Sequence, residues 1–222
     1  MCAKLDATGL LADVVYDTLR VQWPAGRGRF RLYRRADGGF WMTDELNLDV
    51  TELPPPIQYV EVHAGADWQV ESLDLRLAHF GWDASYRAEG LTWRAKIQIE
   101  DKTVERAAPF GPTTQVSCSS IWIDAIALNR LRLAPGQARE VNVISISPHW
   151  MLEPKVVRQR YECMGPERIA TPVGDLDAMH HVIAGAHHVW VDSHGIIVAA
   201  RQEAEGSSAV TSLIEYHWLG AS

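Results

Sequence analysis

The chain has 222 residues, of which 47% are hydrophobic and 22% charged, and its formal net charge is −7. This composition excludes a disordered chain, a collagen, a coiled coil and a membrane span. The acidic balance argues against nucleic acid as a partner, because phosphates need concentrated positive charge. Nine Trp and nine His are conspicuous, since such side chains suit the walls of a ligand cavity as well as a core.

The three cysteines, Cys2, Cys118 and Cys163, show no CxxC spacing, so neither a zinc finger nor a redox pair is expected. Free thiols are typical of a reducing compartment. Residues 1–11 lack the basic segment and apolar run of a signal peptide. The sequence therefore predicts a cytoplasmic protein.

The spacing of apolar residues changes from helical to strand-like within the first forty residues or so. Residues 9–20 place leucines and valines at helical spacing, which predicts a short amphipathic helix. Arginines at 27–35 alternate with apolar residues, which predicts a strand with a solvated basic face. The turn Asp37-Gly38-Gly39 then joins this strand to another at 40–43 as a hairpin.

Strict alternation marks the later strands. The clearest runs over 91–99, with one face formed by Leu91, Trp93, Ala95, Ile97 and Ile99. Residues 119–133 interrupt the pattern and predict a short helix or a chain crossing, ended by Pro135-Gly136. Further strands are predicted at 73–77, 157–163, 187–192, 196–201 and 210–219.

Roughly seven to ten short strands with turns between them indicate an antiparallel sheet that curls on itself. The predicted fold class is mostly β: an antiparallel curved sheet that forms a spiral β-roll or half-open barrel with one or two short helices. We expect a single domain over 1–222, in which 1–25 is an N-terminal helix or strand extension.

Several short motifs of the C-terminal half resemble the family named "putative glycolipid-binding". They are 128–133 with Pro135-Gly136, 139–147, Gln159-Arg160-Tyr161, Trp190-Val191-Asp192 and 195–198. The resemblance covers roughly residues 68–200 and implies a spiral β-roll, similar in outline to lipoprotein carriers that hold acyl chains. It transfers no catalytic residue. The related carriers are exported, whereas this sequence shows no export signal.

Histidines near the C-terminus are the first candidates for acid–base chemistry. If 187–192 is a strand, His188 and Asp192 share one face but lie about 13 Å apart, four residues at about 3.3 Å each. A hairpin with 179–184 would bring His181 across from this strand. One of these histidines could act as a general base, or they could be solvated or hydrogen-bonded groups on a sheet rim.

Asp124 is a second candidate, because it lies in an apolar run where burial would raise the pKa of its carboxyl group. The alternative is an exposed carboxylate, or one paired with Arg130 or Arg132. The candidate catalytic residues are thus His181, His188, Asp192 and Asp124.

Polar groups on an apolar strand face are the candidates for ligand binding. Gln159 and Tyr161 share a face with Val157, and a ligand can supply the partner that an inward polar group needs. Arg158 and Arg160 on the other face could bind a carboxylate or phosphate, or simply face water. The full candidate set is Trp122, Asn129, Trp150, Gln159, Tyr161 and Trp190.

Two functions follow from these candidates. The first is a binding protein for a hydrophobic or aromatic amphipathic small molecule, held in a Trp-, Tyr- and His-lined cavity. The second is a lyase, isomerase or hydrolase that uses His and Asp in the same cavity. No phosphate-binding loop, nucleophile elbow or metal-ligand spacing is present, so we expect no cofactor and no metal. A homodimer through Trp-rich contacts is a further reading.

Overall fold

The computed structural model describes residues 9–20, 23–48, 57–78, 81–118, 120–147, 150–204 and 207–220. These residues form one sheet of fifteen strands and one α-helix. The strands are β1 (Leu10–Arg20), β2 (Trp23–Arg34), β3 (Phe40–Leu48), β4 (Ile57–Ala64), β5 (Val70–Leu77), β6 (Trp82–Glu89), β7 (Thr92–Ile99), β8 (Lys102–Pro109), β9 (Gln115–Ser117), β10 (Ala138–Ser145), β11 (Lys155–Thr171), β12 (Gly174–Ile183), β13 (His187–Val191), β14 (Ile197–Ala204) and β15 (Ser207–Trp218), and the helix α1 is Trp122–Leu131.

The strand order explains how one sheet holds the whole chain. It runs β8 to β1 in reverse sequence order, then β15 to β9, so that the first and last strands pair in the middle. The described strand pairs are antiparallel except β9 with β10, which is parallel. Antiparallel neighbours need only short connections, which the repeated turns of the sequence supply. The mostly-β, antiparallel prediction is confirmed.

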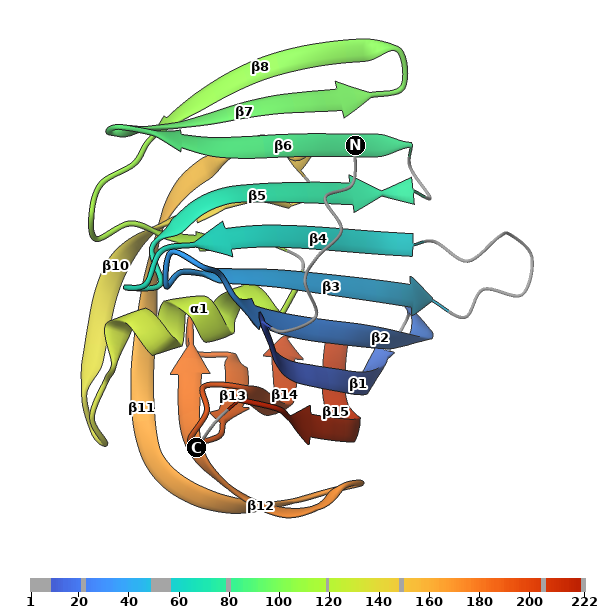
Figure 1. Ribbon diagram of the computed structural model, residues 1–222, viewed down its shortest axis with the longest axis vertical. Helices are drawn as coiled ribbons and strands as arrows, with labels where there is room; N and C mark the ends of the chain where they lie inside the picture. The colour runs from blue at the N-terminus through green and yellow to red at the C-terminus, as the bar shows by residue number, and fades with distance from the viewer. Residues whose placement is uncertain are drawn as a thin grey trace.

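The sheet curls until distant strands meet, as Figure 1 shows. The Tyr86 hydroxyl on β6 donates a hydrogen bond to the Leu152 carbonyl oxygen at 2.7 Å. Arg106 on β8 forms an ion pair with Glu153 at 2.8 Å, just before β11 begins. These contacts hold the first half of the sheet against the segment that leads into β11, so the concave face becomes an enclosed core.

Alternation places the apolar side chains on this concave face. On β7, Trp93, Ala95 and Ile97 are buried, whereas Arg94 and Lys96 are exposed. The predicted strand at 91–99 is therefore confirmed over 92–99, but Leu91, expected on the inward face, lies in the turn before β7 and is exposed. A two-residue period forces this pattern, because successive side chains leave a strand on opposite sides.

The helix predicted at 9–20 is wrong, because these residues form β1. Ala12, Val14 and Tyr16 are buried at a period of two. The strand lies between β2 and β15 in the middle of the sheet, and not in an extension outside it. Pairing on both edges outweighs the local helical spacing of the leucines and valines.

The helix predicted within 119–133 is confirmed as α1, which packs inside the curl of the sheet (Figure 1). Its side chains are buried almost all round, as expected for a helix in a core and not on a surface. Trp122 stacks on Phe30 of β2 with ring centroids 4.1 Å apart and meets the Tyr16 ring edge-on at 5.5 Å. No helix in the described ranges is long and apolar enough to cross a membrane.

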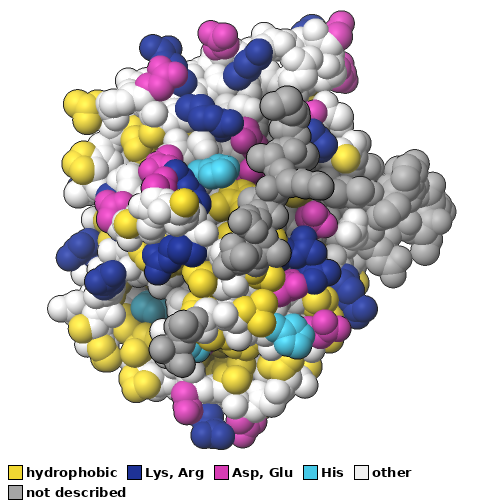
Figure 2. All heavy atoms as spheres, in the orientation of Figure 1, with side chains coloured by type: hydrophobic (Ala, Val, Ile, Leu, Met, Phe, Trp, Pro, Cys, Tyr) yellow, Lys and Arg dark blue, Asp and Glu magenta, His cyan; other side chains and the backbone are white. Residues whose placement is uncertain are grey.

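The basic strand predicted at 27–35 belongs to β2 and is paired with acidic groups. Arg27 forms an ion pair with Asp17 at 3.0 Å, and Arg29 pairs with Asp13. The carboxylates belong to β1, the neighbouring strand. Figure 2 shows the same mixing of acidic and basic side chains over much of one face of the molecule. These arginines therefore present little free positive charge to a polyanion.

Candidate functional site

The candidate catalytic residues lie in separate places. His181 on β12 is buried on the concave face, in the row of Cys163 and Val189. His188 on β13 faces outward, because the alternate residues Val189 and Val191 are in the core. The structure therefore does not bring His181 and His188 into one site.

Asp192 follows β13 and holds a turn. One of its carboxylate oxygens accepts hydrogen bonds from the backbone N–H groups of His194 and Ile196, both at 2.9 Å. The other accepts the Tyr216 hydroxyl. This is an Asx turn, and it occupies the carboxylate.

Asp124 on α1 contacts His187, which is not among the candidate catalytic residues. Asp124 Oδ2 lies 3.3 Å from Nδ1 of His187, which shares the concave face with Val189. Asp124 is buried, and its Oδ1 has no hydrogen-bond partner. The hydroxyl of Tyr161, also buried, has none either. Burial first, and the Asp124 charge second, raise the pKa of Tyr161, so its hydroxyl keeps its proton.

His181 is kept neutral by its surroundings. Burial, and after it the charge of the neighbouring His180, lowers its pKa to about 4. Its Nδ1 has no hydrogen-bond partner within the described structure. A neutral imidazole in an apolar setting fits a core position as readily as a base.

The outer face of β12 and β13 carries a stacked cluster. His180 Nε2 lies 3.0 Å from His188 Nδ1, and the His180 ring stacks on Trp190 with centroids 4.6 Å apart. The Trp190 indole N–H donates to Glu167 Oε2 at 2.8 Å, and the same oxygen lies 3.3 Å from His180 Nδ1. Trp190 and His188 thus belong to this surface cluster and not to a concave cavity.

The remaining ligand-binding candidates are also engaged. Trp122 is in the core, and Asn129 donates to the Gly195 carbonyl oxygen at 2.9 Å. The Lys155 ammonium lies 4.8 Å from the Trp150 ring centroid. Gln159 is half-buried on β11 beside Val141 of β10.

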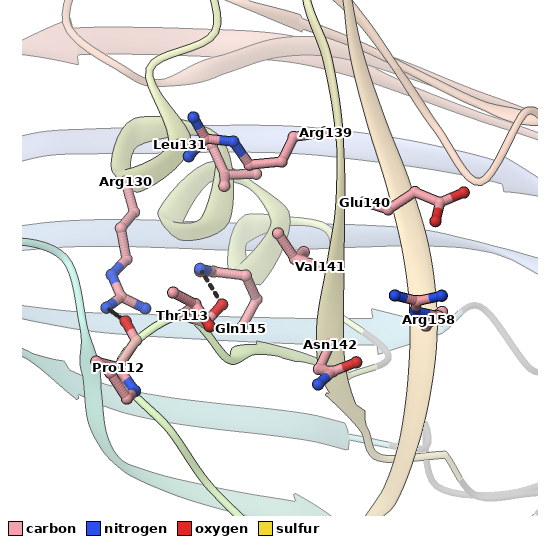
Figure 3. A pocket seen from close by; sticks show the side chains of 10 residues that line it. All are labelled: Pro112, Thr113, Gln115, Arg130, Leu131, Arg139, Glu140, Val141, Asn142 and Arg158. Atoms are coloured by element: carbon pink, nitrogen blue, oxygen red, sulfur yellow. Dashed lines mark hydrogen bonds between the residues drawn. The ribbon is translucent and has the colours of Figure 1, made fainter.

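A pocket of about 490 Å³ opens at the rim of the roll. Arg158, a possible carboxylate or phosphate ligand by sequence, lines it, whereas none of the candidate catalytic and ligand-binding residues does. It lies between the C-terminal end of α1, the first half of β10 and the turn before β9 (Figure 3). Such a volume is typical of small-molecule sites. The residues that line it are Pro112, Thr113, Gln115, Arg130, Leu131, Arg139, Glu140, Val141, Asn142 and Arg158.

Arginines give this pocket its charge. Arg130, at the helix end, donates to the carbonyl oxygens of Thr114, at 3.2 Å, and of Pro112, which ties it to the turn before β9. Burial lowers its pKa from the usual value, so this guanidinium is partly withdrawn from water. Figure 3 shows Arg139 reaching from β10 toward Leu131. The lining of the pocket thus contains three arginines and a single carboxylate, that of Glu140.

Two of these arginines have no carboxylate partner. On β11, Arg160 pairs with Glu162 at 2.9 Å and Arg168 approaches Asp175 at 3.6 Å. No ion pair within the described residues engages Arg139 or Arg158. In the same part of the chain, no three His, Cys, Asp or Glu side chains group so as to hold a metal ion.

Comparison with known proteins bears on the fold. The chain matches no protein-family model and no curated protein. The crystal structure of a β-barrel-like protein of the domain of unknown function DUF1849 from Brucella abortus superposes with a TM-score of 0.63 at 10% identity, covering 96% of this chain and 99% of that one. At this identity the likeness shows the fold alone. It agrees with the curved β architecture that the sequence resemblance implies, but no family model supports the glycolipid-binding family itself.

Two weaker matches concern location. They are a "putative lipoprotein" from Parabacteroides distasonis, with a TM-score of 0.37, 8% identity and coverage of 93% and 95%, and a "putative exported protein" with a YmcC-like fold from Bacteroides fragilis, with a TM-score of 0.38, 6% identity and coverage of 94% and 99%. The descriptions of these neighbours, a lipoprotein and an exported protein, contradict the cytoplasmic prediction. At these TM-scores they carry no further argument.

Proposed function

We propose that the protein binds a small amphipathic molecule with an acidic group in the pocket at the rim of the roll. The observation that carries the proposal is that three arginines, Arg130, Arg139 and Arg158, line one pocket of about 490 Å³. A planar guanidinium can bind a carboxylate or phosphate through two parallel hydrogen bonds. The β-barrel-like fold is compatible with such a role.

Apolar side chains supply the other half of the recognition. Leu131, Val141 and Pro112 line the pocket between the charged groups. An aliphatic or aromatic body would lie against them, at a gain of about 25 cal/mol per Å² of apolar surface removed from water. A charged hydrogen bond adds roughly 1.5–3 kcal/mol, so charge and apolar contact contribute on a similar scale.

Catalysis receives less support than binding. His187 and Asp124 lie within 3.3 Å of each other, but neither lines the pocket. A general base must be within reach of its substrate. We therefore put forward binding and not an acid–base reaction.

The test uses anilinonaphthalene sulfonate, an aromatic amphipathic anion whose fluorescence reports binding. We expect one site per chain, displaced by dodecanoate. The double variant Arg139→Gln, Arg158→Gln removes two unpaired charges and should weaken binding by about tenfold or more. The matched control is Arg168→Gln, on the far part of β11, which should leave the affinity unchanged.

Circular dichroism and thermal unfolding would establish that both variants keep the wild-type fold. Equal loss of affinity in the double variant and in Arg168→Gln would mean that only overall charge matters. Unchanged affinity in a folded double variant would place the site elsewhere, and the proposal would fail.

A further inference from the structure

The pocket contains a stretch of sheet edge without a partner strand. β10 pairs with β11 along its whole length, from Ala138 to Ser145. On its other side it pairs with β9 only from Val143 to Ser145. Within the described residues, the edge over 138–142 therefore has no strand beside it. This stretch coincides with the pocket, which is lined by 139–142.

The alternation of hydrogen-bonded residues along β10 shows which backbone groups point toward the open edge. The Cys163 N–H donates to the Gln137 carbonyl oxygen at 2.9 Å, at the start of the β10–β11 ladder. Antiparallel ladders alternate, so Arg139 and Val141 turn their backbone groups toward β11, and Glu140 and Asn142 turn theirs to the opposite edge. Ile146 has the same parity as Glu140 and Asn142, and its N–H donates to the carbonyl oxygen of Ser117, the last residue of β9, at 2.8 Å. Both hydrogen bonds therefore place the backbone groups of Glu140 and Asn142 at the open edge of β10.

We propose that the pocket ligand is a short extended peptide that carries an acidic group and adds to β10 as a strand, in line with β9. This inference rests on the proposed function and names its ligand class. The backbone of Glu140 and Asn142 would pair with the peptide backbone, as in other cases of strand addition. Arg139 lies on the side of the β10–β11 ladder that carries Val141, and Arg158 lies on the opposite side with Asn142. A carboxylate of the peptide, on a side chain or at the C-terminus, would therefore bind the arginine on the side to which it points, or Arg130 at the end of the helix.

The dimensions fit this occupant. The open stretch 138–142 spans about 13 Å, four steps of roughly 3.3 Å each, which is the length of a five-residue extended peptide. Alternate side chains of an added strand leave on opposite faces. One set would therefore meet the concave side of the strand, where Val141 and Leu131 lie, and the other set would face the rim.

Charge selects an acidic peptide over a second copy of this chain. Pairing β10 with its own copy would bring the two arginine groups together, and like charges across an interface are repulsive. An acidic peptide instead complements three arginines against one glutamate.

The experiment measures fluorescence anisotropy of a fluorescein-labelled Thr-Val-Ser-Val-Asp peptide with a free C-terminus. The label is on residue 1, and the backbone is N-methylated either at residues 2 and 4 or at residues 3 and 5. The two peptides are therefore isomers of equal charge. In an added strand only one set of N–H groups faces β10. We expect one isomer to bind like the parent and the other to lose at least about tenfold in affinity. The Arg139→Gln, Arg158→Gln variant should weaken the parent peptide, and Arg168→Gln should not.

The outcomes separate this inference from the proposed function. Equal binding of both isomers, or no peptide binding while anilinonaphthalene sulfonate still depends on the arginines, would overturn strand addition and leave small-anion binding intact. Loss of arginine dependence for both ligands would overturn both. Light scattering that shows a dimer dispersed by the parent peptide would assign the edge to a second copy and also overturn the inference.

Discussion

At the scale of single residues, the core contains a buried carboxyl group beside the central helix. Asp44 on β3 is buried, and Tyr16 donates a hydrogen bond to its Oδ1 at 2.7 Å, whereas Oδ2 has no partner. Burial raises its pKa to about 6, partly offset by hydrogen bonds from Tyr16 and Ser120. A carboxyl group in this setting holds its proton more tightly in the folded chain than in the unfolded one.

The sign of the pH dependence follows from this shift. The stabilising contribution of Asp44 is fully present below its unfolded pKa of 3.8 and is lost as the pH rises through about 6. Asp44→Asn removes the ionisation and keeps an acceptor for Tyr16. We expect it to raise the free energy of unfolding by about 1–3 kcal/mol at pH ~8 and to change it little at pH ~4. Urea unfolding at both pH values measures this, and an equal effect at both would contradict it.

The residues that line the pocket could not be identified as a site from the sequence alone. Arg158 was noted for its fit to a carboxylate, but its alternation with Glu162 is also typical of a solvated strand. Arg139 and Arg130 carry no local signal. These two arginines line one pocket because the end of α1 lies beside the unpaired part of β10. To predict this arrangement from the sequence, the register of β9, β10 and β11 would have to be known.

At the scale of elements, the sequence predicts a segment best where local and tertiary preferences agree. The alternation of 91–99 holds in β7, where Trp93 is inward as expected. In 9–20 the apolar residues suit either period, and the two strands that flank β1 decide the outcome. β9 has only three residues and no recognisable pattern, so its short pairing, which leaves the edge of β10 open, could not be foreseen.

The end of α1 offers a test at this scale. Arg132 caps the helix in the left-handed region, with φ 47° and ψ 49°, and its N–H donates to Leu128 O at 3.0 Å. A side chain costs about 1 kcal/mol there relative to glycine. Arg132→Gly should therefore raise the free energy of unfolding by about 0.5–1 kcal/mol, measured by urea unfolding. Arg132→Ala, which loses the same charge but keeps a Cβ atom, should not, and an equal gain would assign the effect to charge.

At the scale of the whole molecule, one sheet wraps one buried helix within the described residues, and the proposed binding surface lies at the rim. Trp122 and its aromatic neighbours fill the concave face, so the predicted Trp- and His-lined cavity corresponds to packed core. The rim remains open because β9 begins only opposite Val143, and the helix ends beside the open stretch of β10. Ligand recognition in this account therefore depends on charge and on a sheet edge, not on an aromatic interior.

The most direct test is a titration of the nitrogen-15-labelled protein with dodecanoate, followed through its backbone amide signals. The account predicts saturable shifts that are largest at 130–132 and 139–142, and that disappear in the Arg139→Gln, Arg158→Gln variant but persist in Arg168→Gln. Largest shifts around His181 and Tyr161 would place the ligand inside the roll and contradict the account.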